Sequence, residues 1–442
     1  MKDNKKSLLE LLYLILNELN KSSCKYAIIH NSESLEDAIS GDIDLAFNKH
    51  PIKVLYPILQ DLQKKYNFQI IQCLHYDIPH GYYFIIQYKN DYLHLDCLFD
   101  PEGISRYHLS TQYLLENTRS NSKFNYVNCN NEYVYNVIKR SLKGSVTEGH
   151  VKRLCDNFPN DGGTLKILKE WIGSENLEKL KQLTPNDMDT VKSIFTSYKN
   201  YIQKSYKTNN GLQYTYGLVY SLIRKMKRFI YPTGIFVVIV GPDGCGKSTI
   251  NSEATARLHR AFRKTWSFHW RPNLLPKLGK SSNSSNFSDN TPSQKSKYKG
   301  LISYVRFFYY WLDFVLGYWL IVYPKKAQTT FVISERYYID ILVHPERYGF
   351  SCPRWFMRIF GVFVPKPDLT ILLSADPQKI HDRKPELPVN VIADQINEYS
   401  EIISGWGESS IVDTSQSIED ASTEFVDKVH VKCSDKLKRR LG

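Results

Sequence analysis

The sequence predicts an α/β protein whose C-terminal half is a three-layer α/β/α domain with a mostly parallel sheet. From about residue 233 onward, short apolar strands alternate with helical segments, and the first strand leads through a glycine-rich turn into a helix. Residues 1–125 instead mix helices and strands, as an α+β domain does, and residues 126–230 are mainly helical. We therefore predict three parts: 1–125, 126–230 (a helical region that completes the N-terminal module and links it onward) and 231–442.

The composition is that of a folded intracellular protein. Of the 442 residues, 42% are hydrophobic and 23% are charged, which excludes a disordered chain. The eight cysteines occur singly, without a C-x-x-C pair or the spacing of a metal site, so we expect reduced thiols and a cytoplasmic location. The net charge of +13 favours anionic partners. Because the basic residues form no long stripe, nucleic acid is not expected, whereas peripheral contact with the inner face of a membrane and the oligomeric state stay open.

The first element is expected to be an amphipathic core helix at about 7–19. Glu10 interrupts its apolar run and no small-residue cleavage site follows, which argues against a signal peptide. Further along, the segment 41–45 reads Gly-Asp-Ile-Asp-Leu, and 92–99 alternates strongly between polar and apolar residues. Asp42 and Asp44 would face one side of a strand, and Asp96 would share a face with His94. Three carboxylates on two adjacent strands can hold two Mg²⁺ ions for transfer of a nucleotidyl group.

Residues 25–125 resemble the polymerase-β type of nucleotidyltransferase, on the motif at 41–45 and the third acid at Asp96. The resemblance implies Asp42, Asp44 and Asp96 as metal ligands. The Gly-Ser pair of that family is replaced by Ile-His-Asn-Ser at 29–32, where only Ser32 matches, and a relic domain without activity is the alternative. In the helical region that follows, helices are expected at 132–142, 165–172 and 188–205. We expect Lys139, Arg140 and Lys143 on a solvated face, and the alternative is that they face the substrate of the acidic site.

The glycine-rich turn at 241–249 carries the strongest motif of the chain. It reads Gly-Pro-Asp-Gly-Cys-Gly-Lys-Ser-Thr and fits the phosphate-binding pattern G-x-x-x-x-G-K-[ST]. The unbroken apolar run 235–240 before it is typical of a buried parallel strand, and 249–263 is expected to be a helix. Backbone N–H groups of the loop and of the helix N-terminus would then surround phosphates. We expect the nucleotide to be bound by Gly241, Gly244, Gly246, Lys247, Ser248 and Thr249, with Mg²⁺ on Ser248.

Later strands place further polar residues at the same sheet edge. The run 330–334 is a buried strand that ends at Glu335 and Arg336, where open α/β sheets bind ligands. Glu335 would organise Mg²⁺ or orient an acceptor, and Arg336 would bind an acceptor oxyanion. A third strand is expected at 367–373, and a helix starting at 377 leads to Arg383, whose basic neighbourhood would act as a lid.

Two segments between these strands are less regular. Residues 277–299 are rich in Ser and Asn and are expected to form a mobile loop. Residues 307–323 are very apolar, yet Asp313 lies in their middle and the run is short for a membrane span. We expect a buried helix there, with a membrane-surface role as the alternative. Asp313 would need a partner, either in a structural ion pair or at an acceptor site.

Residues 233–430 resemble the thymidylate-kinase-like branch of P-loop nucleotide and nucleoside kinases. The motifs behind this are 241–249, Ser-Glu-Arg-Tyr-Tyr-Ile-Asp at 334–340, the strand 367–373, the Arg383 stretch, and a closing strand and helix at 412–426. The resemblance implies ATP and Mg²⁺ in the loop, an acceptor held by Arg336 and a lid near Arg383. The usual Asp-Arg-Tyr of the family is Glu-Arg-Tyr here, and His-Trp-Arg-Pro occupies 269–272, so an acceptor other than thymidylate is indicated.

The sequence therefore predicts a cytoplasmic ATP- and Mg²⁺-dependent phosphotransferase acting on a nucleotide, sugar or glycan acceptor, with a nucleotidyltransferase activity in the N-terminal module left open. Proteins of this two-module kind resemble those of bacterial surface-polysaccharide loci. Lys247, Glu335, Arg336, Asp243 and Arg383 are the expected catalytic residues. Asp243 or Glu335 would accept the proton of a hydroxyl acceptor. The alternative is a P-loop ATPase or switch module, with the N-terminal domain as a binding scaffold.

Overall fold

The computed structural model describes residues 2–29, 39, 41–75, 81–100, 109–209, 211–278 and 300–441. Ser32 and all but the first two residues of the predicted loop 277–299 lie outside these ranges. The chain forms two compact units, 1–226 and 227–442, and the division falls inside helix α9 (Gly211–Ile230). Each unit is described by itself.

The first unit is built on a seven-stranded mixed sheet with the order β3-β4-β5-β2-β1-β7-β6. Strand β2 runs parallel to β5, so that Asp44 lies opposite Asp96, whereas β3, β4 and β5 form an antiparallel meander. The strands are β1 (Tyr26–Ile28), β2 (Ile43–Phe47), β3 (Phe68–His75), β4 (Gly81–Tyr88), β5 (Asp91–Leu98), β6 (Arg119–Ser120) and β7 (Asn125–Tyr126).

Helices cover this sheet and complete its core. The predicted core helix is present as α1 (Lys2–Lys21), which buries Leu8, Leu12 and Leu16. Side chains of the helical region pack against Ala46 of β2 and Leu98 of β5 in one hydrophobic cluster, so this region belongs to the first unit. The remaining helices are α2 (Pro51–Lys65), α3 (Thr111–Leu114), α4 (Cys129–Lys143), α5 (Glu148–Asp156), α6 (Gly162–Ile172), α7 (Ser174–Lys181) and α8 (Met188–Asn209).

The second unit contains a five-stranded parallel sheet with the order β12-β11-β8-β10-β9. The first strand in the sequence, β8, lies in the centre and is buried along its whole length, which explains its unbroken apolar run. The parallel sheet confirms the predicted fold class. The strands are β8 (Ile235–Val240), β9 (Lys264–His269), β10 (Thr330–Glu335), β11 (Leu369–Ser374) and β12 (Ser409–Asp413).

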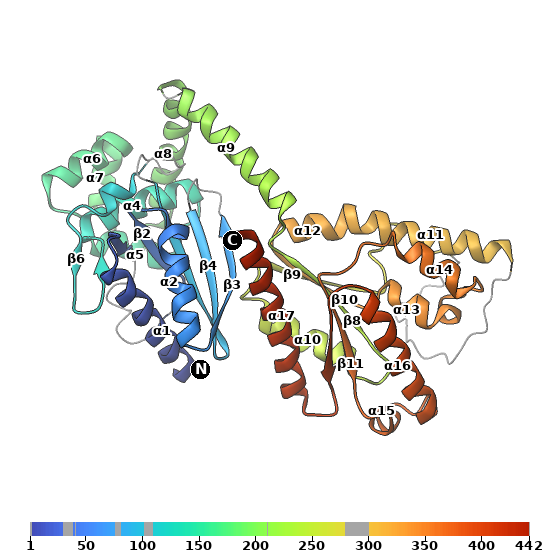
Figure 1. Cartoon of the computed structure of the whole chain (residues 1–442). Helices are drawn as coiled ribbons and strands as arrows, with labels where there is room; N and C mark the ends of the chain where they lie inside the picture. The colour runs from blue at the N-terminus through green and yellow to red at the C-terminus, as the bar shows by residue number, and fades with distance from the viewer. Residues whose placement is uncertain are drawn as a thin grey trace. The chain divides into compact units, whose positions relative to one another are not determined.

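Helices lie on both faces of this sheet (Figure 1). Helices α10 (Lys247–Leu258) and α17 (Ile418–Leu441) pack together against one face. The other face carries α13 (Tyr338–Val343), α14 (Arg354–Gly361) and α16 (Val389–Gly405), whose side chains share a cluster with Phe236 and Val238 of β8. The 3-10 turn η3 (Pro345–Tyr348) and the helix α15 (Pro377–Arg383) complete the connections. Helix α10 ends earlier than predicted, since residues 259–263 form a turn into β9.

The predicted aromatic helix begins earlier and is longer than expected. Helix α11 (Leu301–Gly317) continues through the π-helical turn η2 (Tyr318–Val322) into α12 (Tyr323–Ala327). Asp313 is fully buried and forms an ion pair with Arg271, its Oδ2 lying 2.8 Å from Nη1. Of the two alternatives for this carboxylate, the structural ion pair is therefore the one observed.

Candidate active site

The phosphate-binding pattern forms a loop between the carboxyl end of β8 and the start of α10. Gly241, Gly244 and Gly246 all have positive φ values, of 145°, 89° and 92°. A Cβ atom on Gly241 would lie 2.5 Å from the carbonyl oxygen of Leu373, so a side chain cannot be accommodated there. Glycine is thus required both for the backbone conformation and for the close packing of the loop on β11.

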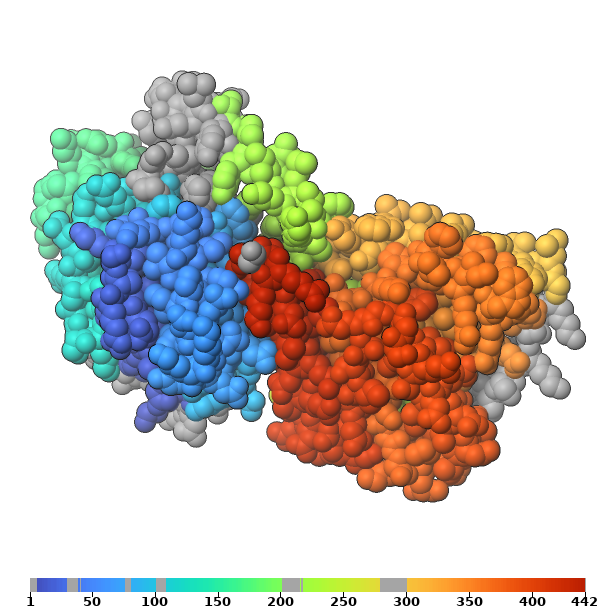
Figure 2. All heavy atoms as spheres, viewed as in Figure 1, coloured from blue at the N-terminus to red at the C-terminus, as the bar shows by residue number. Residues whose placement is uncertain are grey.

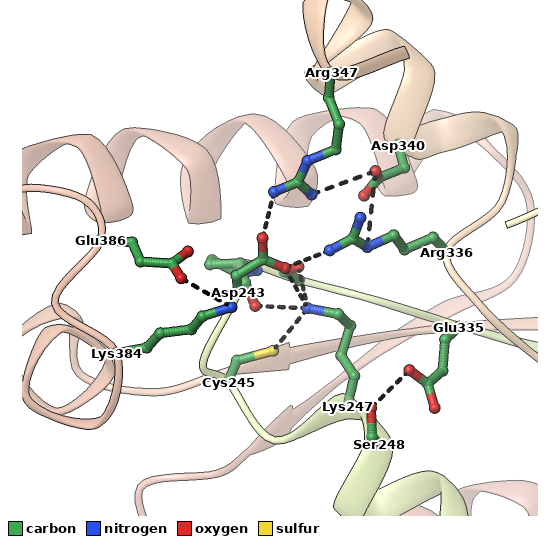
Figure 3. Close-up of polar contacts among 12 residues, drawn as sticks. Asp243, Cys245, Lys247, Ser248, Glu335, Arg336, Asp340, Arg347, Lys384 and Glu386 are labelled. Atoms are coloured by element: carbon green, nitrogen blue, oxygen red, sulfur yellow. Dashed lines mark hydrogen bonds and ion pairs between the residues drawn. The ribbon is translucent and has the colours of Figure 1, made fainter. Parts of the chain in front are cut away.

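Lys247 begins α10, and its side chain folds back over the loop. Its Nζ donates to the carbonyl oxygens of Gly241 (2.9 Å) and Pro242 (2.7 Å), and it lies 3.5 Å from Oδ1 of Asp243. The side chain is only 8% exposed. The ammonium therefore lies within the loop, beside the N-terminus of α10, where backbone N–H groups favour anions (Figure 3).

Ser248 and Glu335 bring two oxygen donors together at this edge. The Ser248 hydroxyl donates to Glu335 Oε2 at 2.9 Å, and the Asn251 amide donates to Oε1 at 2.8 Å. Mg²⁺ is usually held by one or two protein oxygens, with water and substrate phosphates completing its shell. A hydroxyl next to a carboxylate beside this loop fits that requirement, so Ser248 and Glu335 could hold Mg²⁺. Thr249 follows on α10 and is exposed.

Asp243 is held between three cations. Its carboxylate accepts hydrogen bonds from the guanidinium groups of Arg336 and Arg347 and faces the Lys247 ammonium (Figure 3). Burial by itself would raise the pKa of Asp243, but Lys247, Arg336 and Arg347 outweigh it and hold the pKa far below its usual range. Because a general base needs a pKa near the working pH, Asp243 is unsuited to that role and instead positions the two guanidinium groups.

Asp340 on α13 is a second carboxylate that lies close to Arg336 and Arg347. It is fully buried and accepts hydrogen bonds from the Tyr348 and Tyr399 hydroxyls. Its Oδ2 lies 4.0 Å from Arg336 Nε and 3.9 Å from Arg347 Nη1. Burial raises the pKa of Asp340, but Arg336 and other nearby cations lower it more, so the carboxyl group stays ionised. The sequence analysis included Asp340 in its Ser-Glu-Arg-Tyr-Tyr-Ile-Asp motif without giving it a role.

Arg336 has a backbone conformation that is rare for its residue type. Its φ is 64°, a left-handed value that costs about 1 to 3 kcal/mol in a non-glycine residue. Two hydrogen bonds fix it, from Arg336 N–H to the Ile239 carbonyl (2.8 Å) and from the Ser334 hydroxyl to the Arg336 carbonyl (2.6 Å). The strained residue turns the chain at the end of β10, so that the guanidinium lies over the loop instead of continuing the strand.

Arg347 was missed by the sequence analysis, and Arg383 has different contacts from those predicted. Arg347 lies in η3, a short turn without a motif. Arg383 ends α15 and donates from Nη2 to the Thr414 carbonyl at 2.9 Å. The residue beside the loop is Lys384, since a Cβ on Gly244 would lie 3.0 Å from Lys384 Cβ. The Nζ atom of Lys384 lies 3.3 Å from Glu386 Oε1, so the positive charge of the predicted lid near Arg383 is partly neutralised.

In the first unit, the three predicted acids do come together, but a lysine ammonium and an imidazole contact them. Lys139 of α4 lies 3.1 Å from Asp44 Oδ2, and His94 Nδ1 lies 3.1 Å from Asp42 Oδ1. Lys139 is buried, contrary to the expected solvated face. Burial, with Asp44 beside it, raises the pKa of Asp96 to about 7. Within the described ranges, no group of three or more His, Cys, Asp or Glu side chains is placed to hold a metal ion.

The acidic cluster therefore does not fit a two-metal centre in this arrangement. The Lys139 ammonium occupies the position next to Asp44 that a cation bound by this carboxylate would need.

Comparison with known proteins gives limited further information. No protein-family model matches the chain, and the search of curated proteins found no significant match. Among solved structures, the chain is similar to a thymidylate kinase from Ehrlichia chaffeensis, with 15% sequence identity and a TM-score of 0.30. The similarity covers 45% of this chain and 99% of that one. At these values the similarity does not assign an activity to the chain.

Proposed function

We propose that the second unit transfers the γ-phosphoryl group of ATP, with Mg²⁺, to a small acceptor that carries a phosphate or another anionic oxygen. One observation carries this proposal. A phosphate-binding loop with its lysine, a hydroxyl–carboxylate pair and a cluster of two arginines meet at the carboxyl edge of one parallel sheet (Figure 3). Phosphoryl transfer depends mainly on positioning and charge neutralisation, which these groups supply.

The loop and α10 form the donor side. Their N–H groups would bind the β- and γ-phosphates, and Lys247 would leave the Gly241 and Pro242 carbonyls to neutralise the developing charge. Ser248 and Glu335 would hold Mg²⁺, which would act as a Lewis acid and stabilise the negative charge of the phosphates.

The arginine cluster forms the acceptor side. Arg336 and Arg347 carry two positive charges that balance the two negative charges of Asp243 and Asp340, and their guanidinium N–H groups are the donors that would bind an anionic acceptor. Asp243 is a poor base because its pKa is far below neutrality. An acceptor phosphate is largely ionised near neutral pH and needs no base, so a nucleotide or sugar phosphate suits the site better than a free hydroxyl.

The test is turnover by the full chain with Mg²⁺ and ATP, read by mass spectrometry against nucleoside monophosphates, sugar phosphates, nucleosides and free sugars. We expect one phosphorylated acceptor from the first two groups. Lys247→Ala should lower kcat about a hundredfold or more, whereas Lys428→Ala, a matched change on α17 where the lysine pairs with Glu424, should leave it unchanged.

One further variant separates the two sides of the site. Arg347→Gln removes a charged hydrogen bond to Asp243 and one acceptor-side cation, so the acceptor KM should rise about tenfold or more while ATP binding is retained. Near-wild-type turnover in Lys247→Ala would refute the proposal. ATP hydrolysis by the wild type without any modified acceptor would favour the ATPase or switch module instead.

A further inference from the structure

The long helix of the second unit exposes an apolar stripe to solvent. Leu301, Val305, Leu312, Leu316 and Trp319 recur at intervals of three, four or seven residues along α11 and η2, which places them on one side of the helix. All are exposed, Leu301 by 80% and Val305 by 62%. Large apolar side chains gathered on one side of a helix normally mark an interaction surface.

Helix α14 exposes a second stripe of the same kind. Trp355 and Ile359 lie one turn apart on the helix, and Val362 and Phe363 follow directly after its end. Val362 is 76% exposed and Trp355 is 64% exposed. The opposite side of α14 is buried through Met357 and Gly361, so the exposed apolar side chains are not the ones that pack the helix onto the unit.

The two stripes join into one surface. Phe360 of α14 lies edge-on to Phe308 and Trp311 of α11, with ring centroids 4.9 and 5.4 Å apart, and the Trp311 indole N–H donates to the Phe360 carbonyl at 2.9 Å. The spheres of both helices adjoin in Figure 2, α11 in yellow-orange and α14 in orange. We call the exposed side chains of 301–320 and 355–363 the apolar face.

The segments that form the apolar face contain positive charges and almost no negative ones. Between residues 347 and 367 the sequence contains no Asp or Glu, whereas Arg354, Arg358 and Lys366 are exposed there. Arg354 pairs with Glu398 of α16. Along α11, η2 and α12 the only carboxylate is Asp313, which is buried on Arg271. An apolar surface with a cationic border is complementary to a membrane that contains anionic lipid.

We propose that the apolar face docks the second unit on the surface of a bilayer that contains anionic lipid, with α11 and α14 lying in the plane of the interface. Exposed tryptophans such as Trp319 and Trp355 favour the membrane–water interface, where an indole ring is partly hydrated. A second copy of the chain is a poorer occupant, because two like faces would bring Arg358 and Lys366 of both copies together without carboxylates from the face to pair with them.

The segment Leu301–Ala327 is long and apolar enough to cross a membrane by length and composition, but its packing opposes crossing. Phe307 and Phe314 on its inner side are fully buried in the core of the unit. Asp313 is tied by hydrogen bonds to Arg271 and to the backbone N–H groups of Asn273 and Leu275. Removing the helix from the unit would expose this core and an unpaired charge, so contact along one side is favoured over crossing.

The test is flotation of the full chain with vesicles of phosphatidylcholine alone and of phosphatidylcholine mixed with phosphatidylglycerol. We expect the wild type to float with the mixed vesicles, less at high salt, and weakly with phosphatidylcholine alone. Ile359→Glu should lower the partition coefficient about tenfold or more, because it inserts a carboxylate into the apolar face. Val431→Glu on α17 is a matched control, since Ile359 and Val431 are 52% and 50% exposed, and it should bind as the wild type does.

A milder variant keeps the test independent of folding. Arg358→Gln leaves the apolar side chains in place and should reduce only the preference for the phosphatidylglycerol vesicles. Absence of wild-type flotation with either vesicle would overturn the proposal. So would equal losses in Ile359→Glu and Val431→Glu, or a dimer in analytical ultracentrifugation that Ile359→Glu dissociates, which would assign the face to a second copy. Because binding is read without ATP, the result is separate from that of the phosphoryl-transfer assay.

Discussion

Replacing Asp313 by Asn should be among the most destabilising single changes in the second unit. The carboxylate and the Arg271 guanidinium are 0% and 1% exposed and lie 2.8 Å apart, so the change leaves a buried cation without its counter-charge. Breaking such a pair from one side costs about 3 to 5 kcal/mol. The asparagine Oδ1 still accepts one backbone hydrogen bond, whereas Asp313→Leu also frees the N–H groups of Asn273 and Leu275, at about 1 to 3 kcal/mol each.

Urea denaturation of the full chain followed by tryptophan fluorescence measures this effect. Six of the seven tryptophans lie beyond residue 226 and only Trp171 precedes it, so the signal reports mainly on the second unit. With an m-value of about 2 to 3 kcal/mol per M, Asp313→Asn should lower the midpoint by about 1 to 2 M.

A double variant distinguishes the buried charge from lost packing. Arg271→Met combined with Asp313→Leu leaves no unpaired charge, so it should be more stable than Asp313→Leu alone. A loss below about 1 kcal/mol in Asp313→Asn, or a double variant less stable than both single variants, would refute the reasoning from the buried pair.

Three further predictions concern other parts of the chain. Burial lowers the pKa of His344 to about 4, so between about pH 6.5 and pH 4 the unfolded chain binds a proton that the folded protein does not. The free energy of unfolding should therefore fall by about 3 kcal/mol as the pH falls through this window. Urea titrations of His344→Gln should lack that part of the pH dependence, and an unchanged pH dependence would contradict the assignment. Gly241→Ala combines a positive φ with a 2.5 Å contact and should lower the free energy of unfolding by about 3 kcal/mol or more in the same assay. At Gly246 a Cβ atom meets open space, so Gly246→Ala should lower it by only about 1 kcal/mol. Equal losses would argue against the contact at Gly241. Lys139→Met removes the ammonium group beside Asp44 and should destabilise the first unit by about 3 kcal/mol at neutral pH, and by less near pH 5, where Asp96 is protonated. Hydrogen exchange of β2 and β5 measures this loss of stability. A loss that does not depend on pH would exclude the missing lysine charge as its cause.

The sequence predicted the central part of the second unit closely because burial there leaves a simple pattern. Strand β8 is flanked by strands on both sides and covered on both faces, so every residue is apolar and the bounds 235–240 could be read directly. Strand β9 lies at the sheet edge and buries only Phe268 of its six residues, so its sequence shows neither an apolar run nor a regular alternation.

Side chains whose partners are distant in the sequence were the ones that could not be placed. Lys139 is on a helix whose own pattern suggested a solvated face, but its partner Asp44 lies on a strand 95 residues earlier. The need of Asp313 for a partner was predicted, whereas its identity as Arg271 depends on the fold. Arg347 lies in a short turn without periodicity, and its ion pairs with Asp243 and Asp340, which no local pattern connects to it, place it at the site.

The rate at which the Cys245 thiol is alkylated can report how often the phosphate-binding loop opens. The thiol is fully buried under Gly241 and lies 3.9 Å from the Lys247 ammonium, and burial raises its pKa, so the native loop protects it from alkylation. Cys129 is exposed, so we expect it to be alkylated without any opening of the structure and to serve as an internal reference in the same molecule. The ratio of the two labelling rates gives the fraction of time that the loop spends open, and a ligand that closes the loop would register as a slower rate at Cys245 alone.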